Sequence, residues 1–201
     1  MNILIIPGFT GYPEEKTFQE LGETLTSKGC RVFKIAWPNL PDNLDGYNFT
    51  NTIEHASEVI EGLDKKDDLI ILGFSMGGVI ATVLANKYNP IKLGLIVSPY
   101  QAGSEDDLAG KYNEWKQTGK LELTSSRFGK LTIPFSFIED AQKYNALDII
   151  FNIKCPKIFI AGEEDTKVPL NVSKKLFDKA VEPKKWHQKQ GMEHKYQYQP
   201  D

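Results

Sequence analysis

The chain has 201 residues, of which 40% are hydrophobic and 25% charged, and its formal net charge is −3. This size and composition suit one globular domain spanning residues 1–201, and the weak negative charge argues against a nucleic-acid partner. No apolar run has the length of a membrane span or the basic start of a secretory signal, so we expect a cytoplasmic location. The two cysteines, Cys30 and Cys155, do not indicate a disulfide framework.

The first third of the chain alternates short apolar runs with amphipathic stretches. The pattern predicts strands over residues 3–6 and 31–37. Between them, apolar side chains at helical spacing predict a helix with Gly29 as its C-terminal stop. A second helix is predicted where Asn51 and Glu54 have the spacing of a capping box, and its buried stripe comprises Ile53, Ala56, Ile60 and Leu63.

The alternation continues with a third strand, predicted over residues 69–74. Its nearly continuous apolar character is typical of a central parallel strand that is covered on both faces. A helix is predicted from Ser75 to about Asn89, and another opens at Pro169. Further strands are predicted over 93–97, 157–161 and 184–190, the last at an edge because it is polar. Such alternation predicts an α/β fold with a doubly wound, mostly parallel sheet.

Residues 99–150 interrupt this alternation. They contain polar turns, a helical pattern over residues 112–117 and several aromatic side chains. A long insertion between two strands is typical of a lid or binding loop, and an ordinary helical connection is the alternative. Residues 144–150 are expected to form such a helix before the next strand. We interpret the aromatic side chains of the insertion as packing residues.

The sequence Gly73-Phe74-Ser75-Met76-Gly77 joins the third strand to the helix that follows it. This is typical of a nucleophile elbow, a tight turn between a strand and a helix that exposes a serine hydroxyl. Small residues at positions 73 and 77 allow the backbone to make the turn without side-chain clashes. The pattern therefore predicts Ser75 as a nucleophile.

An acid and a base are predicted at the same edge of the sheet. Asp165 follows the strand over 157–161, and His194 follows the last strand. Ligands of open parallel sheets bind beyond the carboxyl ends of the strands, so these side chains are expected to lie near Ser75. His194 would take the serine proton and return it to the leaving group, and Asp165 would orient the imidazole.

Other residues compete for both roles. Glu163 and Glu164 are alternatives to Asp165 as the acid. The chain has three histidines. We interpret His55 as a surface residue of the second helix and His187 as an ordinary side chain within the last strand. His194, which lies beyond a strand end, is the candidate base.

Backbone N–H groups are needed to stabilise the negative charge that develops on the substrate oxygen. The N–H of Met76 lies at the start of the helix after the elbow. The loop Pro7-Gly8-Phe9-Thr10-Gly11 follows the first strand and is placed to supply the second donor through Phe9. Phe9 and Met76 are therefore the predicted oxyanion-hole residues.

Together these motifs resemble the α/β-hydrolase family, and in particular its small carboxylesterase-like members. The resemblance spans positions 8 to 194, although Pro7 stands where many members have a histidine. It implies a compact α/β-hydrolase fold and hydrolysis of a small-molecule ester or thioester through an acyl-enzyme. It also implies that the reaction requires neither a cofactor nor a metal.

Two alternatives to an esterase remain open. The same serine, acid and base could serve a peptidase or amidase, in which Glu105, Asp106 and Asp107 would hold the amine of a short substrate. A solvated acidic turn is the simpler interpretation of these carboxylates. The second alternative is a catalytically silent binding protein on the same scaffold.

Overall fold

Six parallel strands form the central sheet of the computed structural model, which describes residues 1–64, 66–103 and 111–194. The spatial order of the strands is β2-β1-β3-β4-β7-β8. The strands in chain order are β1 Asn2–Ile6, β2 Arg31–Lys34, β3 Leu69–Phe74, β4 Lys92–Ile96, β7 Lys157–Gly162 and β8 Lys184–Lys189. The predicted α/β fold with a mostly parallel sheet is confirmed, and β8 lies at the predicted edge.

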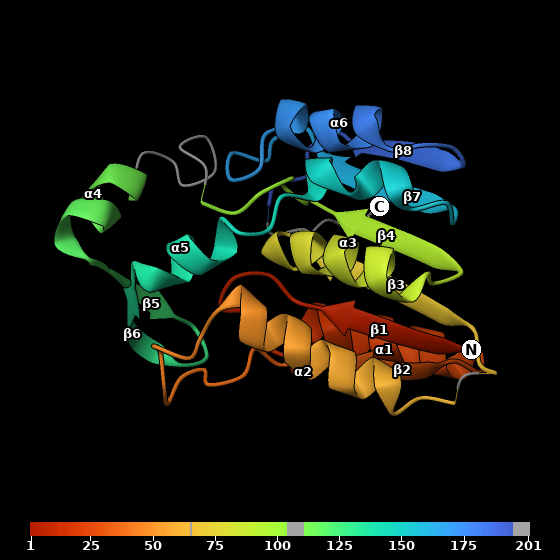
Figure 1. Cartoon of the computed structure of the whole chain (residues 1–201), viewed down its shortest axis with the longest axis horizontal. Helices are drawn as coiled ribbons and strands as arrows, with labels where there is room; N and C mark the ends of the chain where they lie inside the picture. The colour runs from red at the N-terminus through yellow and green to blue at the C-terminus, as the bar shows by residue number, and fades with distance from the viewer. Residues whose placement is uncertain (65, 104–110, 195–201) are drawn as a thin grey trace.

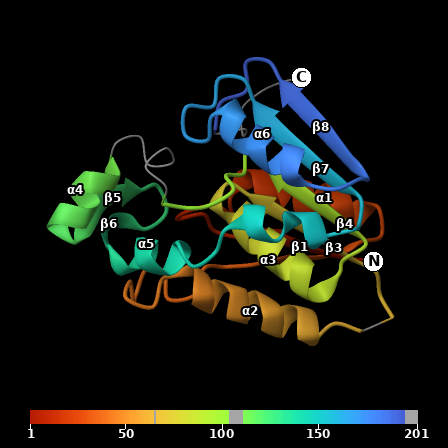
Figure 2. The ribbon, with the colours of Figure 1, turned by 45° about the horizontal axis from the view of Figure 1, so that its top comes forward.

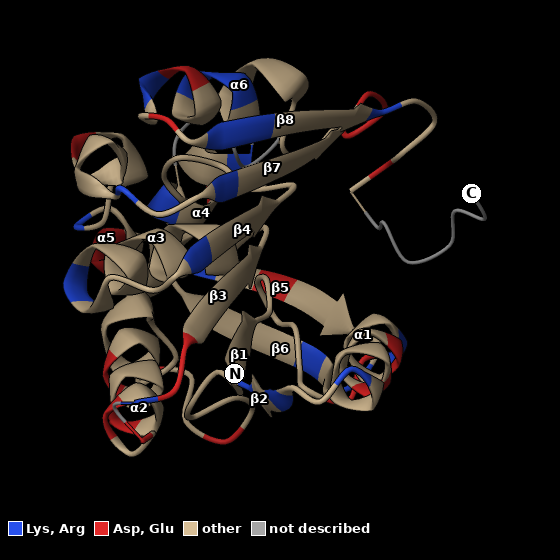
Figure 3. Cartoon of the chain, turned by 90° about the vertical axis from the view of Figure 1, so that its right-hand side faces the viewer, with Lys and Arg blue, Asp and Glu red and all other residues tan. Residues whose placement is uncertain are grey.

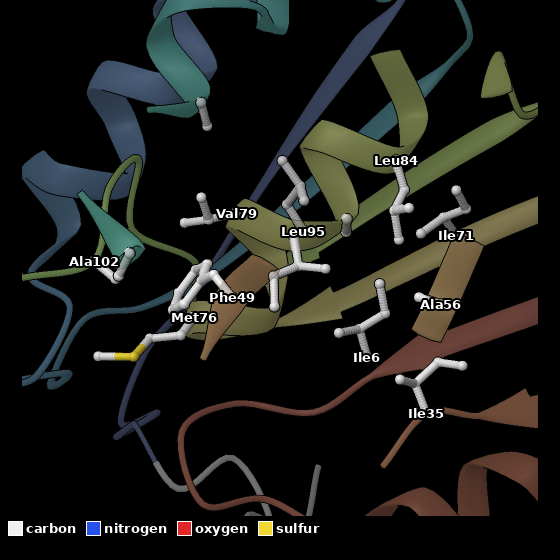
Figure 4. Close-up of a cluster of buried hydrophobic side chains, with 14 of the residues drawn as sticks. Ile6, Ile35, Phe49, Ala56, Ile71, Met76, Val79, Leu84, Leu95 and Ala102 are labelled. Atoms are coloured by element: carbon white, nitrogen blue, oxygen red, sulfur yellow. The ribbon is translucent and has the colours of Figure 1, made fainter. Parts of the chain in front are cut away.

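Helices cover both faces of the sheet (Figure 1). On one face lie α2 Phe49–Glu61, α3 Met76–Tyr88 and α6 Leu170–Lys179, and on the other lies α1 Lys16–Ser27 (Figure 3). Figure 4 shows the larger core cluster, in which Ile6, Ile71 and Leu95 of the sheet lie close to Leu84 of α3. The side chains of alternate strand residues, such as Ile5 and Phe74, point to the α1 face.

The strand register brings two loops together at the carboxyl edge of the sheet. Ile6 of β1 lies opposite Gly73 of β3, and Phe74 lies opposite Ile96 of β4. As a result, the loop that begins at Pro7 and the turn at Ser75 leave the sheet side by side. The register therefore positions the two segments that were predicted to carry the oxyanion donors.

Two boundaries in the first third of the chain differ from the prediction. β2 ends at Lys34, and Trp37 leaves the strand to donate its indole N–H to the carbonyl oxygen of Pro7 at 3.2 Å. The helix α2 begins at Phe49, one turn earlier than predicted, because the Asn48 side chain accepts the N–H of Asn51 at 2.8 Å. The predicted capping box at Asn51 is therefore wrong, and Asn48 is the capping residue.

The insertion between β4 and β7 contains a hairpin that the sequence pattern did not predict. Its strands β5 Lys120–Ser125 and β6 Gly129–Pro134 pair antiparallel, between α4 Lys111–Thr118 and α5 Ser136–Ala141. The helix expected over 112–117 corresponds to α4. The single helix expected over 144–150 is wrong, because this segment forms two short 3₁₀ helices, η1 Ala146–Asp148 and η2 Ile150–Asn152. Figures 1 and 2 show the hairpin, α4 and α5 beyond the carboxyl ends of the strands.

The α1 face of the sheet is covered less completely than the opposite face. A groove of about 340 Å³ lies between α1 and strands β3, β4 and β7. Its lining is almost entirely apolar: Leu21, Leu72, Phe74, Ile96, Ile158, Ile160, Lys189 and Met192. Several of these side chains are only half-buried, whereas most strand side chains on the α3 face are buried.

None of the helices in the described part of the chain combines the length and the apolar character that crossing a bilayer requires. Cys30 is buried and Cys155 is half-buried, and neither of them is paired in a disulfide.

Candidate active site

Ser75 occupies a strained turn between β3 and α3. Its backbone φ is 52° and ψ is −127°, a region that non-glycine residues rarely adopt and that costs about 1–3 kcal/mol. The turn is held by two hydrogen bonds: the Ser75 N–H donates to Ile96 O at 2.9 Å, and Ser75 O accepts from the Gly78 N–H at 2.8 Å. A side chain at Gly77 would collide with the carbonyl oxygens of Ile6 and Pro7, so the turn needs glycine there.

The loop after β1 passes directly alongside the serine. A Cβ atom at Gly8 would lie 2.9 Å from the Cβ of Ser75 and 3.5 Å from its Oγ. Only a residue without a side chain allows such a close approach. The loop that carries Phe9 is thereby brought against the serine hydroxyl.

His194 connects the serine to a buried carboxylate. Its Nε2 lies 3.0 Å from Ser75 Oγ, and its Nδ1 lies 2.8 Å from Asp165 Oδ2. The carboxylate can only accept, so Nδ1 carries the shared proton and Nε2 is left to accept the serine hydroxyl proton. The Asp165 side chain has no exposed surface, whereas 25% of the His194 side chain is exposed. The His194 imidazole is therefore accessible from solvent, and the Asp165 carboxylate behind it is not.

Backbone groups hold the Asp165 carboxylate in place. Its Oδ1 accepts from the N–H groups of Lys167 at 2.8 Å and Val168 at 2.9 Å, which leaves Oδ2 for His194. The two rival carboxylates, Glu163 and Glu164, are both exposed. The structure therefore brings Asp165, and neither rival, into contact with the histidine.

The remaining histidines lie on other parts of the sheet and helices. His187 is exposed within β8, as expected for an ordinary strand side chain, and His55 is half-buried in α2. Neither has a hydrogen bond to Ser75 or Asp165 within the described part of the chain. Of the three histidines, His194 is the one that the structure places at the serine.

The two predicted oxyanion donors belong to the turn at Ser75 and to the loop beside it. Met76 is the first residue of α3, so its N–H has no partner within the helix. The N–H of Phe9 has no hydrogen-bond acceptor among residues 1–64, 66–103 and 111–194. The next two N–H groups of the loop are both used: Thr10 donates to the Tyr47 hydroxyl at 2.8 Å, and Gly11 donates to Gly8 O at 2.9 Å.

Aromatic side chains of the insertion pack against the loop after β1. The ring of Phe9 lies 5.0 Å from that of Phe137 and 6.4 Å from that of Trp115, between ring centroids. Phe137 and Trp115 are themselves buried, and the Trp115 indole N–H donates to Ile133 O at 3.0 Å. For these two residues the interpretation as packing residues agrees with the structure.

Acidic side chains were predicted as one alternative set of ligand groups, for the amine of a short substrate. The carboxylates of Glu105, Asp106 and Asp107 lie outside the described residues. In the part of the chain that the structure describes, no group of three or more His, Cys, Asp or Glu side chains is arranged to hold a metal ion. Tyr47 and Trp37, which hold the loop after β1, were not predicted in this role, because Tyr47 lies in a segment without helical or strand periodicity and Trp37 was expected to be an ordinary residue of the second strand.

Comparisons with known proteins agree with this architecture. Residues 3–173 match the alpha/beta hydrolase family, a segment that contains Ser75 and Asp165 but not His194. A sequence search finds no match among curated proteins.

Several solved structures share the fold over most of their length. One is Est1E from Butyrivibrio proteoclasticus, at 20% identity and a TM-score of 0.70 over 98% of this chain and 81% of that chain. Mouse alpha/beta hydrolase domain-containing protein 10 has 20% identity and a TM-score of 0.76 over 96% and 81% of the two chains. A monoacylglycerol lipase from Paleococcus ferrophilus has 16% identity and a TM-score of 0.74 over 96% and 86%. At these identities the likeness concerns the fold alone.

Proposed function

This chain belongs to the alpha/beta hydrolase family, and on that premise we propose that it is a serine hydrolase of carboxylic esters or thioesters. The observation that carries the proposal is the continuous hydrogen-bonded series from Ser75 Oγ through His194 to Asp165, with distances of 3.0 and 2.8 Å. A serine hydroxyl needs an adjacent base to become a nucleophile at neutral pH, and the base needs an orienting group. This chain holds all three in hydrogen-bond contact.

In the first half of the proposed reaction, Ser75 becomes acylated. His194 Nε2 takes the hydroxyl proton while Oγ attacks the carbonyl carbon, and Asp165 stabilises the resulting imidazolium. The N–H groups of Phe9 and Met76 donate to the oxyanion of the tetrahedral intermediate. His194 then protonates the leaving oxygen or sulfur, the bond to the acyl carbon breaks, and the acyl group remains on Oγ.

The second half repeats the chemistry with water. His194 takes a proton from the water as it attacks the acyl carbon, and a second tetrahedral intermediate forms on the same donors. The intermediate collapses, its bond to Ser75 Oγ breaks, and the proton returns from His194 to that oxygen. The loss of one oxyanion donor typically lowers turnover by about 10²- to 10³-fold, which makes these N–H groups essential to the proposal.

Solved structures with the same fold support an ester rather than an amide as the substrate. The Paleococcus ferrophilus protein is a monoacylglycerol lipase, whose substrates are esters, and Est1E has been solved with bound ferulic acid, a carboxylic acid of the kind that ester hydrolysis releases. We propose small to medium acyl groups for this chain. The peptidase alternative lacks a comparable observation, because the carboxylates that would hold a substrate amine lie outside the described residues.

We also propose that residues 99–150 form a small lid within one domain that spans residues 1–201. The position of the hairpin, α4 and α5 beyond the carboxyl ends of the strands supports this role. The contact of Phe137 and Trp115 with Phe9 supports it further, because these side chains place the insertion against the proposed oxyanion loop.

A panel of p-nitrophenyl esters from acetate to decanoate tests the proposal, with acetylthiocholine as a thioester and alanine p-nitroanilide as an amide. We expect ester or thioester turnover that falls off for long acyl chains and is abolished in Ser75→Ala. Alanine at position 75 removes the hydroxyl and leaves the backbone turn with the same requirement for positive φ, so the variant is a matched control.

Three outcomes would contradict the proposal in different ways. Full activity of Ser75→Ala would exclude Ser75 as the nucleophile. Turnover of the anilide alone would favour a peptidase. The absence of any turnover, together with no labelling of Ser75 by a fluorophosphonate probe, would favour a catalytically silent protein.

A further inference from the structure

The loop after β1 contains a residue, Thr10, whose backbone, like that of Ser75, is strained by a positive φ. Thr10 has a backbone φ of 55°, in the left-handed region that β-branched residues rarely adopt. Such a conformation costs about 1–3 kcal/mol and persists only where the surroundings hold it. Thr10 directly follows Phe9, one of the two proposed oxyanion donors.

The strain at Thr10 belongs to a tight turn. The Gly11 N–H donates to Gly8 O at 2.9 Å, which closes a four-residue turn with Phe9 and Thr10 at its centre. Only the second central residue, Thr10, has a positive φ, which is the signature of a type II turn. Glycine is the usual residue at that position. Threonine fits a type I turn better, in which the peptide between the two central residues is rotated by about 180° relative to a type II turn.

The Tyr47 hydroxyl holds that central peptide. It accepts the Thr10 N–H at 2.8 Å, and this N–H would point elsewhere if the peptide between Phe9 and Thr10 rotated. Tyr47 is 0% exposed, and burial raises the pKa of its phenol far above its ordinary value, so the hydroxyl stays neutral. The acceptor is thus available at any pH at which the protein is assayed.

The position of this hydroxyl is fixed by the packing of its ring. The Tyr47 ring stacks on Phe137 of α5 with 4.9 Å between centroids and an interplanar angle of 25°, and it lies 5.1 Å from Trp37. Trp37 holds the start of the same loop through its bond to Pro7 O. Tyr47 and Trp37 therefore anchor the two ends of the segment that carries Phe9.

We propose that Tyr47 is a positioning residue for the oxyanion hole. Its hydroxyl holds the peptide between Phe9 and Thr10 and keeps Thr10 in the left-handed conformation, and this anchors the loop so that the neighbouring N–H of Phe9 stays in place for the substrate oxyanion. This inference rests on the proposed serine hydrolase function. It assigns to Tyr47 no contact with the substrate, and its effect passes entirely through the backbone of Phe9 and Thr10.

Tyr47→Phe tests the proposal, because phenylalanine keeps the buried ring and removes only the hydroxyl. Complete loss of an oxyanion donor lowers turnover by about 10²- to 10³-fold. A misplaced donor should lose less, so we expect kcat to fall by about 10- to 100-fold, with KM within about threefold of wild type. Tyr144→Phe is the control, since the Tyr144 hydroxyl makes a partly buried contact, at 2.7 Å from Thr50 Oγ1, but none with the loop.

A double variant tests the role of the turn itself. Glycine adopts a positive φ without steric cost, so adding Thr10→Gly to Tyr47→Phe should recover part of the lost kcat. A double variant no faster than Tyr47→Phe would contradict the role assigned to Thr10. The recovery of kcat separates positioning from stability. If Tyr47→Phe lost activity only because the fold is less stable, glycine at position 10 would not restore kcat.

The remaining outcomes distinguish this inference from the proposed function. If wild type shows Ser75-dependent turnover and Tyr47→Phe keeps kcat within twofold, the inference is overturned and the function stands. The same holds if Tyr47→Phe and Tyr144→Phe lose kcat equally at equal losses of Tm. A wild-type chain without Ser75-dependent turnover would overturn both.

Discussion

The Asp165 carboxylate is enclosed by hydrogen-bond donors on both of its oxygens. Two are the backbone N–H groups of Lys167 and Val168, and the third is the imidazole of His194. These three hydrogen bonds fix the orientation of the carboxylate. Its contact with Nδ1 decides which nitrogen of His194 faces the serine. The loop after β7 therefore sets the tautomer of His194 through a single oxygen atom.

Asp165→Asn should lower kcat by about 10³- to 10⁴-fold with little change in KM. The amide oxygen can still accept from Lys167 and Val168, so the loop should keep its shape. The amide group that replaces Oδ2 can donate to Nδ1, which favours the tautomer with its proton on Nε2 and removes the charge that stabilises the imidazolium. Steady-state kinetics on the best ester of the panel measures the effect.

Glu163→Gln is the control for this substitution. Glu163 lies two residues away on the same loop, is exposed, and accepts from the Gln188 side chain at 2.7 Å. Its neutral isostere should leave kcat within about twofold of wild type. A loss of less than tenfold in Asp165→Asn, or an equal loss in Glu163→Gln, would show that Asp165 is not the orienting acid.

Sequence patterns predicted the position of these residues but not of those that support them. Ser75, Asp165 and His194 follow strand ends that are recognisable from apolar runs, and parallel strands bring their carboxyl ends to one edge. Tyr47 lies in a segment without periodicity, and its bonding partner, Thr10, is 37 positions away. No local pattern encodes a contact of that kind, so it becomes visible only in the folded chain.

At the scale of elements, a carboxylate joins the insertion to the body of the protein. Asp140 of α5 accepts from the backbone N–H of Thr50 at 2.8 Å, from its hydroxyl at 2.7 Å and from Lys143 Nζ at 2.8 Å. Thr50 lies in the first turn of α2, where backbone N–H groups have no partner within the helix. The negative charge also interacts favourably with the dipole of α2.

Asp140→Asn should lower the free energy of unfolding by about 1–2 kcal/mol at pH 7, because charge-assisted hydrogen bonds are lost. Burial raises the pKa of Asp140, but the hydrogen bonds from Lys143 and Thr50 outweigh it and hold the pKa below its ordinary value. The ionised form is therefore the one that stabilises the fold. Its contribution is complete above the unfolded pKa of about 3.9 and is lost as the pH falls through the folded pKa.

Thermal unfolding of the wild type and of Asp140→Asn between pH 2.5 and pH 7 measures the difference in their stability. We expect a constant gap in Tm above about pH 5 that narrows as the pH falls below about 4. Asp148→Asn is the control, because Asp148 is an exposed acid whose side chain has no hydrogen bond within the described residues. A gap that does not depend on pH would show that the charge of Asp140 does not hold α5 to α2.

The elements that sequence patterns placed wrongly share a physical reason. Asn48 and Asn51 are both good capping residues, and burial of Phe49 decides between them in favour of the earlier start. The β5–β6 hairpin has apolar side chains on alternate residues with exposed polar ones between them, which is a strand pattern, but each run is short and does not by itself decide between a strand and a loop. Tertiary packing, which a local pattern does not contain, settles both cases.

At the scale of the whole molecule, the two faces of the sheet differ in how they are covered. Three helices, α2, α3 and α6, lie on one face, where Ile71 of β3 is 0% exposed. The other face has α1 and the apolar groove, where Ile160 of β7 is only half-buried. Burial of apolar area stabilises the fold roughly in proportion to that area, so isoleucines on opposite faces should differ in what they contribute.

Ile71→Ala and Ile160→Ala compare the two faces with the same substitution in strands of the same sheet. Ile71→Ala leaves a cavity in a fully packed region and should lower the free energy of unfolding by about 2–5 kcal/mol. Ile160→Ala removes atoms that partly face the groove, so its loss should be at most about half as large. Urea unfolding measures both values. Equal losses would contradict the difference in coverage between the two faces of the sheet.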